Sequence, residues 1–257
     1  MKKTMIRILL VALCLLMPLT GCKNRTTGLT YYPESGNYYN SKNDVTYARA
    51  ELYYEAVAVL KDQPFAHVPN KEMGDEVLYQ IEGADPSEML ANEYFEIFYA
   101  NYITLPTLAE MNVNKLYVGS VISGASMDLA VATITNAGDI GAVIALYQSG
   151  PFFHEDARVV EGTATATYRL RFMSADHPAI CYRLFYFEYA EDALIYEQIE
   201  SEEGFEATYK GVEVSFKEHN GKLYAVYNFG KNIIYDQVTG NCYAAGDLLA
   251  KHISDTQ

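Results

Sequence analysis

The sequence predicts an α+β protein in which N-terminal helices pack on an antiparallel β-sheet, a meander formed by the C-terminal half. Two segments of the first half carry apolar residues at spacings of three and four, which is the period of an α-helix. From Ala157 onward the apolar residues alternate with polar ones, which is the period of a strand. Asn220-Gly221 separates two of these alternating runs and is a typical turn sequence of tight β-hairpins.

The first predicted helix runs from Asp44 to Lys61, with Asp44 as its N-cap. Glu51 and Glu55 fall on one face of this helix. The apolar stripe lies on another face and consists of Val45, Ala48, Leu52, Ala56 and Val59.

The second predicted helix begins at Asp85-Pro86-Ser87-Glu88, which offers a capping residue, a proline at the first helical position and a carboxylate at the third. A solvated face carries Glu88, Asn92 and Glu96 at spacings of four. The apolar stripe opposite consists of Leu90, Tyr94, Ile97 and Phe98.

The middle of the chain predicts two strands and a helix. The segments 115–122 and 129–135 are rich in Val, Ile and Thr, and Asn136-Ala137-Gly138 forms a turn after them. Asp139 then caps a short apolar helix.

The C-terminal half predicts a sheet with one polar face. Residues 165–172 alternate, so that Arg169 and Arg171 lie opposite the apolar side chains of the same strand. Residues 179–189 are apolar on both faces and predict a central strand. A parity shift at Gly211 indicates a β-bulge, and residues 247–252 predict a short closing helix. The remaining predicted strands are 193–200, 206–217, 222–229 and 232–238.

The first 21 residues have the three zones of a secretory signal: the basic residues Lys2, Lys3 and Arg7, an apolar run over 8–16, and a short exit that ends at Gly21. The apolar run is shorter than the roughly 18–20 residues that span a bilayer. Leu19-Thr20-Gly21-Cys22 resembles the bacterial lipobox. The resemblance implies cleavage between Gly21 and Cys22 and diacylation of the Cys22 sulfur.

Two acyl chains on one cysteine would anchor the chain stably, because each buried methylene contributes about 0.8 kcal/mol. We therefore expect a lipoprotein on the outer face of the cell membrane, or on the outer membrane of a Gram-negative cell. Residues 22–43 are rich in turn-forming residues and predict a tether that follows the lipidated cysteine, with its tyrosines as possible packing contacts. Residues 44–257 form the α+β domain, with a possible division near 150 into a mixed part, 44–150, and a sheet, 151–257.

Charge excludes one class of partner. The formal net charge is −14, and it becomes −17 once the three basic residues of the signal are removed. An acidic surface repels phosphate backbones, so nucleic-acid binding is disfavoured.

The two cysteines that remain in the domain, Cys181 and Cys242, allow one disulfide, which export would permit. The alternative is that they are buried thiols, because Cys181 lies in an apolar run.

The chain contains no motif for catalysis, a metal or a cofactor. The five histidines are far apart in the sequence, and His154-Glu155-Asp156 with Asp176 and His177 is the densest polar group. Serines at 120, 123 and 126 form no GxSxG elbow. The carboxylate run Glu200, Glu202, Glu203 and Glu206 lacks the alternation of a calcium loop.

Tyrosine is the one composition signal, with 23 residues and no tryptophan. Its apolar ring and polar tip suit packing, protein contacts and sugar stacking, in that order of preference here.

These observations predict a non-catalytic surface module that binds a protein, peptide or envelope polymer. The first alternative is an envelope hydrolase whose carboxylates converge only in the fold. The second is a transporter's solute-binding lipoprotein, which usually needs two βαβ lobes.

Overall fold

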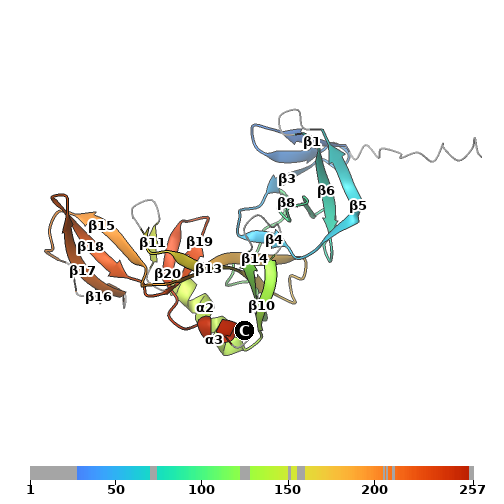
Figure 1. The fold of residues 1–257 in the computed structure, drawn as a ribbon. Helices are drawn as coiled ribbons and strands as arrows, with labels where there is room; N and C mark the ends of the chain where they lie inside the picture. Colours follow the sequence, from blue (N-terminus) through green and yellow to red (C-terminus); the bar gives the residue numbers. More distant parts are fainter. Residues whose placement is uncertain are drawn as a thin grey trace, which may run out of the picture.

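The computed structural model describes residues 28–69, 74–121, 128–149, 152–154, 160–204, 206, 208–209 and 212–254. Over these residues the chain is mainly β, with twenty strands and two helices. The strands form three sheets whose pairings are antiparallel. Figure 1 shows the three sheets in a bent row, with the largest one in the middle.

The N-terminal sheet has seven strands in the order β1-β2-β3-β8-β7-β6-β5. It curls so that its edge strands β1 and β5 lie beside each other. Tyr38 and Tyr47 are fully buried inside it, and the Tyr38 hydroxyl donates to Glu76 across the interior. The strands are β1 (Leu29–Tyr32), β2 (Asn37–Asn40), β3 (Val45–Arg49), β5 (Val59–Val68), β6 (Glu76–Ile81), β7 (Met89–Ala91) and β8 (Ile97–Ala100).

The central sheet has eight strands, seven in the order β10-β9-β13-β14-β19-β20-β11, with β4 also paired to β14. One face is apolar, and it packs against the helices α2 (Ala137–Ser149) and α3 (Ala250–Ser254) through residues such as Val143 and Ile253 (Figure 1). The other face carries arginines. The strands are β4 (Tyr54–Ala56), β9 (Lys115–Val121), β10 (Asp128–Ile134), β11 (Phe152–His154), β13 (Ala164–Met173), β14 (Ile180–Tyr189), β19 (Asn232–Asp236) and β20 (Asn241–Ala244).

The C-terminal sheet has five strands in the order β12-β15-β18-β17-β16. Its inner face packs with Ile233 of β19 and Cys242 of β20, which joins it to the central sheet. The strands are β12 (Val160–Glu161), β15 (Leu194–Ile199), β16 (Thr208–Tyr209), β17 (Val212–His219) and β18 (Lys222–Asn228).

The predicted N-terminal helices are wrong, and with them the α+β class. Residues 44–61 form β3, β4 and the start of β5. Asp44 caps no helix; it lies in a turn with φ of 57°. The β preference of this segment outweighs the apolar spacing of three and four: Val45 and Tyr47 are buried and alternate with half-buried neighbours, as in a strand.

The second helix fails for a different reason. Its start signal forms a single turn, in which Asp85 accepts from the Ser87 amide at 2.8 Å and its backbone carbonyl accepts from Met89. The chain then leaves that turn, because Met89–Ala91 and Ile97–Ala100 pair with each other as β7 and β8.

The described part of the predicted tether also forms β-strands. Of the segment 22–43, residues 28–43 are described, and they contain the paired strands β1 and β2. Here the tyrosines pack: Tyr38 contacts Phe98 edge to face, with 4.8 Å between ring centroids.

Five of the six strands predicted in the C-terminal half are confirmed, whereas the predicted strand 206–217 is wrong, because β16 and β17 are separate strands there. Asn220 and Gly221 have φ of 52° and 70° and close the β17–β18 hairpin, as predicted. The parity shift near residue 211 is no bulge, because β16 and β17 pair with each other and Tyr209 lies opposite Val212.

The predicted cap of α2, Asp139, is also wrong. The cap is Asn136, whose side-chain oxygen accepts from the amides of Gly138 and Asp139.

No helix among the described residues is long and apolar enough to cross a membrane.

Candidate functional site

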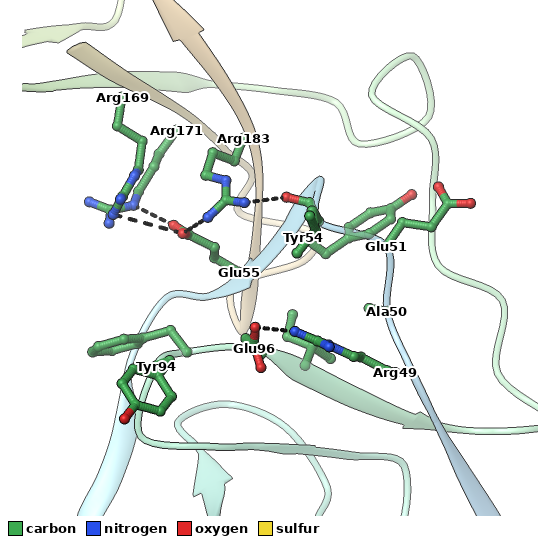
Figure 2. A pocket seen from close by; sticks show the side chains of 13 residues that line it. Arg49, Ala50, Glu51, Tyr54, Glu55, Tyr94, Glu96, Arg169, Arg171 and Arg183 are labelled. Atoms are coloured by element: carbon green, nitrogen blue, oxygen red, sulfur yellow. Dashed lines mark hydrogen bonds and ion pairs between the residues drawn. The ribbon is translucent and has the colours of Figure 1, made fainter. Parts of the chain in front are cut away.

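An arginine-rich pocket lies where the seven-stranded sheet meets the central sheet. Its volume is about 350 Å³. Figure 2 shows Arg169, Arg171 and Arg183 converging on Glu55, with Glu96 and Arg49 on the other side of that carboxylate. We call this the arginine pocket; it is lined by Arg49, Ala50, Glu51, Leu52, Tyr54, Glu55, Tyr94, Phe95, Glu96, Ile97, Arg169, Arg171 and Arg183.

The backbone between β3 and β4 forms the floor of this junction. The Ala50 amide donates to Ile97 at 2.8 Å, and the Ala56 amide donates to Phe95 at 3.0 Å. Between them Glu55 forms an isolated bridge with Glu96. Strand β4 pairs with β14 through the same residues, with Glu55 opposite Cys181. A three-residue strand therefore belongs to the central sheet and also contacts the N-terminal sheet.

The three arginines opposite Glu55 share one sheet face. Arg169 and Arg171 lie two residues apart on β13, and Arg171 lies directly opposite Arg183 of β14. Like charges in directly opposite positions destabilise a sheet unless an anion lies between them. The Glu55 carboxylate supplies that anion.

Glu55 is nearly enclosed, with its side chain 7% exposed. Arg171 Nε donates to Oε2 at 2.9 Å, Arg183 Nη1 donates to Oε1, and Arg169 Nη1 lies 3.8 Å from Oε1. Burial opposes ionisation of this carboxyl, but the three arginines outweigh it and lower its pKa. Glu55 is therefore held as a carboxylate.

Asp128 lies behind the arginines, with its side chain 2% exposed. Its oxygens lie 3.3 Å from Arg169 Nη1 and 2.9 Å from Arg171 Nη1. Gly119 makes the space, since a Cβ there would lie 2.7 Å from that of Asp128. Burial raises the pKa of Asp128 against the pull of Arg171 and Arg169.

Three guanidinium groups thus face two carboxylates, which leaves one positive charge in excess. Arg169 Nε and Arg183 Nε are buried without a hydrogen-bond partner among the described residues. Opposite them, Arg49 pairs with Glu96, which also accepts from Asn92 Nδ2 at 2.7 Å.

The arginine distribution is uneven along the chain. Seven arginines occur in the sequence, and Arg7, Arg25 and Arg158 lie outside the described residues. The other four, which are all the arginines of the described part, line this one pocket. A chain with a formal net charge of −14 therefore concentrates its strongest anion-binding side chains at one point.

The predicted lipidation site cannot be compared with the fold, because Gly21 and Cys22 lie outside the described residues. The predicted cysteine pair can be compared with the fold, because Cys181 and Cys242 are both described, and both are buried. Cys242 of β20 lies opposite Tyr235 of β19, and Tyr235 lies opposite Phe185 of β14. Cys242 is therefore two strands away from β14, at the level of Phe185, which is four residues along β14 from Cys181. Four residues span about 13 Å, whereas a disulfide needs Cα atoms within about 7 Å. This geometry favours the alternative, two buried thiols.

The other candidate clusters do not assemble where they can be compared. Residues 155–156 lie outside the described part, and the Asp176 carboxylate accepts from Asn112 at 3.0 Å. Ser120 lies on β9, whereas residues 123 and 126 are not described. The run at 200–206 lies in an exposed turn. Among the described residues no three His, Cys, Asp or Glu side chains could hold a metal ion together.

Several tyrosines of the predicted strands pack in the cores of the sheets. Tyr182, Tyr186 and Tyr227 are buried, and Tyr189 and Tyr235 are partly buried against the core of the C-terminal sheet. Tyr147 of α2 donates to the buried carboxylate of Asp236 at 3.0 Å and shares a 2.8 Å hydrogen bond with Tyr182. The tyrosine signal is thus largely explained by core packing.

Sequence reasoning placed two of the pocket's four arginines on a common face. The alternation over 165–172 placed Arg169 and Arg171 on a polar strand face, which β13 confirms. Glu55, Glu96 and Arg49 were missed, because all three were assigned to helices. The available signal was the scarcity of arginine in an acidic chain, with three of its arginines in two adjacent strands.

No protein-family model matches the chain, and no curated protein or solved structure is significantly similar to it.

Proposed function

We propose that this chain is a lipid-anchored binding protein of the cell exterior, which holds an anionic group of its ligand in the arginine pocket. The single observation that carries the binding proposal is the gathering of all four described arginines around one cavity, where three of them face two carboxylates. Arginine presents a planar fork of donors that matches carboxylate and phosphate oxygens. The signal and the lipobox-like Leu19-Thr20-Gly21-Cys22 support the anchor.

The chemistry of the pocket favours binding over hydrolysis. A hydrolytic carboxyl pair needs one group that is protonated near neutral pH. Glu55 has a lowered pKa and is committed to three arginines, and Glu96 is committed to Arg49. Neither carboxylate is set up to donate a proton. The lining residues include tyrosine but no histidine, cysteine or serine.

The anchor is tested by Cys22→Ser. We expect the wild-type protein to fractionate with membranes and to incorporate labelled fatty acid, and the variant to lose the label. Fatty-acid labelling that persists in the variant would refute lipidation at Cys22. Cys181→Ser is the matched control, because that thiol is buried in the central sheet.

The pocket is tested with acetate, sulfate and phosphate as probes on the detergent-solubilised full chain, against chloride at equal ionic strength. A probe at about five times its Kd stabilises the protein by about 1 kcal/mol, which raises Tm by about 2–4 °C. Arg169→Gln should abolish the rise. Lys222→Gln removes one charge from an exposed position of the far sheet and should not. A rise in Tm that persists in Arg169→Gln would show that the anion binds at another site.

A further inference from the structure

The walls of the arginine pocket carry opposite charges. Arg169, Arg171 and Arg183 project from the central sheet. Glu96 lies beside the N-terminal sheet, on the far side of Glu55 from these arginines in Figure 2, and Glu51 lines the same cavity. Glu55 and Glu96 form an isolated β-bridge, so the basic wall and the acidic wall adjoin each other at this pair of residues.

The charge of each wall limits the ligand. On the basic wall, three arginines face Glu55 and Asp128, so one positive charge is uncompensated. One carboxylate would neutralise it, whereas a phosphate dianion would leave an excess negative charge. Arg49 neutralises Glu96, and Glu51, which lines the cavity beside Tyr54 in Figure 2, adds one negative charge. One ammonium group would neutralise that charge.

Apolar side chains lie between the charged groups. Leu52 is 42% exposed, and Phe95 and Ile97 line the same cavity. Tyr94 is 66% exposed at its edge. A ligand held by its two charges would therefore place an apolar or aromatic group against these side chains.

We propose that the arginine pocket binds an amino acid or short peptide with free termini, its α-carboxylate on Arg169, Arg171 and Arg183 and its α-ammonium toward Glu96 and Glu51. The proposal rests on the proposed function of this same pocket. It adds the ligand class: a zwitterion of zero net charge, which suits a pocket whose own charges balance in the same way.

The experiment uses the detergent-solubilised full chain and isothermal titration with the dipeptides Gly-Phe, Gly-Leu and Gly-Ala. Each is compared with its N-acetylated form, which lacks the ammonium, and its C-amidated form, which lacks the carboxylate. Each blocked form should bind at least about tenfold more weakly, because a hydrogen bond to a charged group is worth about 1.5–3 kcal/mol.

Two charge-removing variants distinguish the walls. Arg169→Gln should weaken the free and N-acetylated peptides by at least about tenfold and leave the amidated form unchanged. Glu96→Gln should weaken the free and amidated peptides and leave the N-acetylated form unchanged. Lys222→Gln and Glu218→Gln, both exposed on the far sheet, are the matched controls. If Glu96→Gln fails to fold, Glu51→Gln replaces it, since Glu51 is exposed.

The outcomes separate the two proposals. N-acetylated peptides that bind as tightly as free ones, with sensitivity to Arg169→Gln, would overturn the zwitterion and leave the anion pocket standing. If no peptide and none of acetate, sulfate and phosphate binds, both proposals fail. Tighter binding of phosphate than of any free dipeptide would also overturn the ligand class.

Discussion

Glu55 is the residue on which the geometry of the arginine pocket depends. It reaches Arg169, Arg171 and Arg183 from the short strand β4, and its own side chain is almost enclosed. Removing one partner of a buried ion network leaves the others uncompensated, which is why such changes are strongly destabilising.

The first prediction follows from that arrangement. Glu55→Gln should lower the free energy of unfolding by about 3 kcal/mol, because three guanidinium groups would remain close together without their shared anion. Glu51→Gln, four residues earlier and exposed, should change it by less than about 0.5 kcal/mol. Urea unfolding measures both. Equal effects of the two substitutions would show that the network contributes nothing.

A second prediction concerns pH. The lowered pKa of Glu55 contributes stability that is present above the ordinary carboxyl value of 4.5 and is lost as pH falls through the folded value. The raised pKa of Asp128 acts in the opposite sense, because its contribution is present below the ordinary value of 3.8 and is lost as pH rises through the folded value. Glu55→Gln should therefore flatten the loss of stability on acidification below about pH 4.5.

Asp128→Asn is the comparison for this titration. It removes the opposing contribution, so the loss on acidification should become steeper than in the wild type. Both slopes come from urea unfolding at a series of pH values. A wild-type slope in Glu55→Gln would assign the acid sensitivity to other carboxyl groups.

At the scale of elements, local signals in the sequence were reliable for hairpins and unreliable for the N-terminal half. Asn220-Gly221 predicted its turn because positive φ is a property of those two residues. Residues 44–61 and 85–98 contain helix-like spacings and a genuine one-turn cap, but β3 of the first segment pairs with β8, which begins in the second segment and is distant in the sequence. Such pairing energy is not visible in a local window.

Two glycine substitutions give a third prediction at this scale. Gly221→Ala should cost about 1–2 kcal/mol, because φ is 70° and no atom lies near the added Cβ, so the cost is conformational strain alone. Gly141→Ala, in α2 and equally open, should instead stabilise by about 0.5–1 kcal/mol. Denaturant unfolding compares the pair. The same sign for both would contradict the backbone argument.

A fourth prediction concerns how α2 attaches to the central sheet. Tyr147→Phe removes a hydroxyl that reaches both Asp236 and Tyr182. The loss should cost about 1–3 kcal/mol, because the buried carboxylate of Asp236 loses a donor. Tyr102→Phe is the control, since that side chain is 59% exposed. Thermal unfolding measures the difference, and equal Tm values for the two variants would refute the role of the Tyr147 hydroxyl.

At the scale of the whole molecule, the sequence predicted one sheet and the chain forms three. The meander order of the C-terminal strands was visible, but the division into two sheets was not, since β14 pairs with β19 rather than with its neighbour β15. The pocket lies between two sheets, so its lining is brought together from 49–55, 94–97 and 169–183. Sequence analysis could identify the arginines and not their convergence.

The fifth prediction uses the acidic surface. The negative field of the whole chain opposes the approach of an anion to the pocket. Raising the salt concentration screens that repulsion, since the Debye length is about 10 Å at 0.1 M. The association rate of an N-acetylated dipeptide should therefore rise with salt, whereas that of a free dipeptide should change little. Stopped-flow fluorescence at two ionic strengths tests this, and equal salt dependence for both peptides would contradict it.

The narrowness of β4 has a consequence for the mechanics of the chain. The Ala56 amide of β4 donates to Phe95, next to β8, and so links the central sheet to the N-terminal sheet. A ligand that draws the arginines and Glu96 together would slow the opening of this junction, so the Ala56 amide should exchange with deuterium more slowly when the cavity is occupied. Ligand binding in this one cavity would therefore make the link between the N-terminal sheet and the central sheet stiffer.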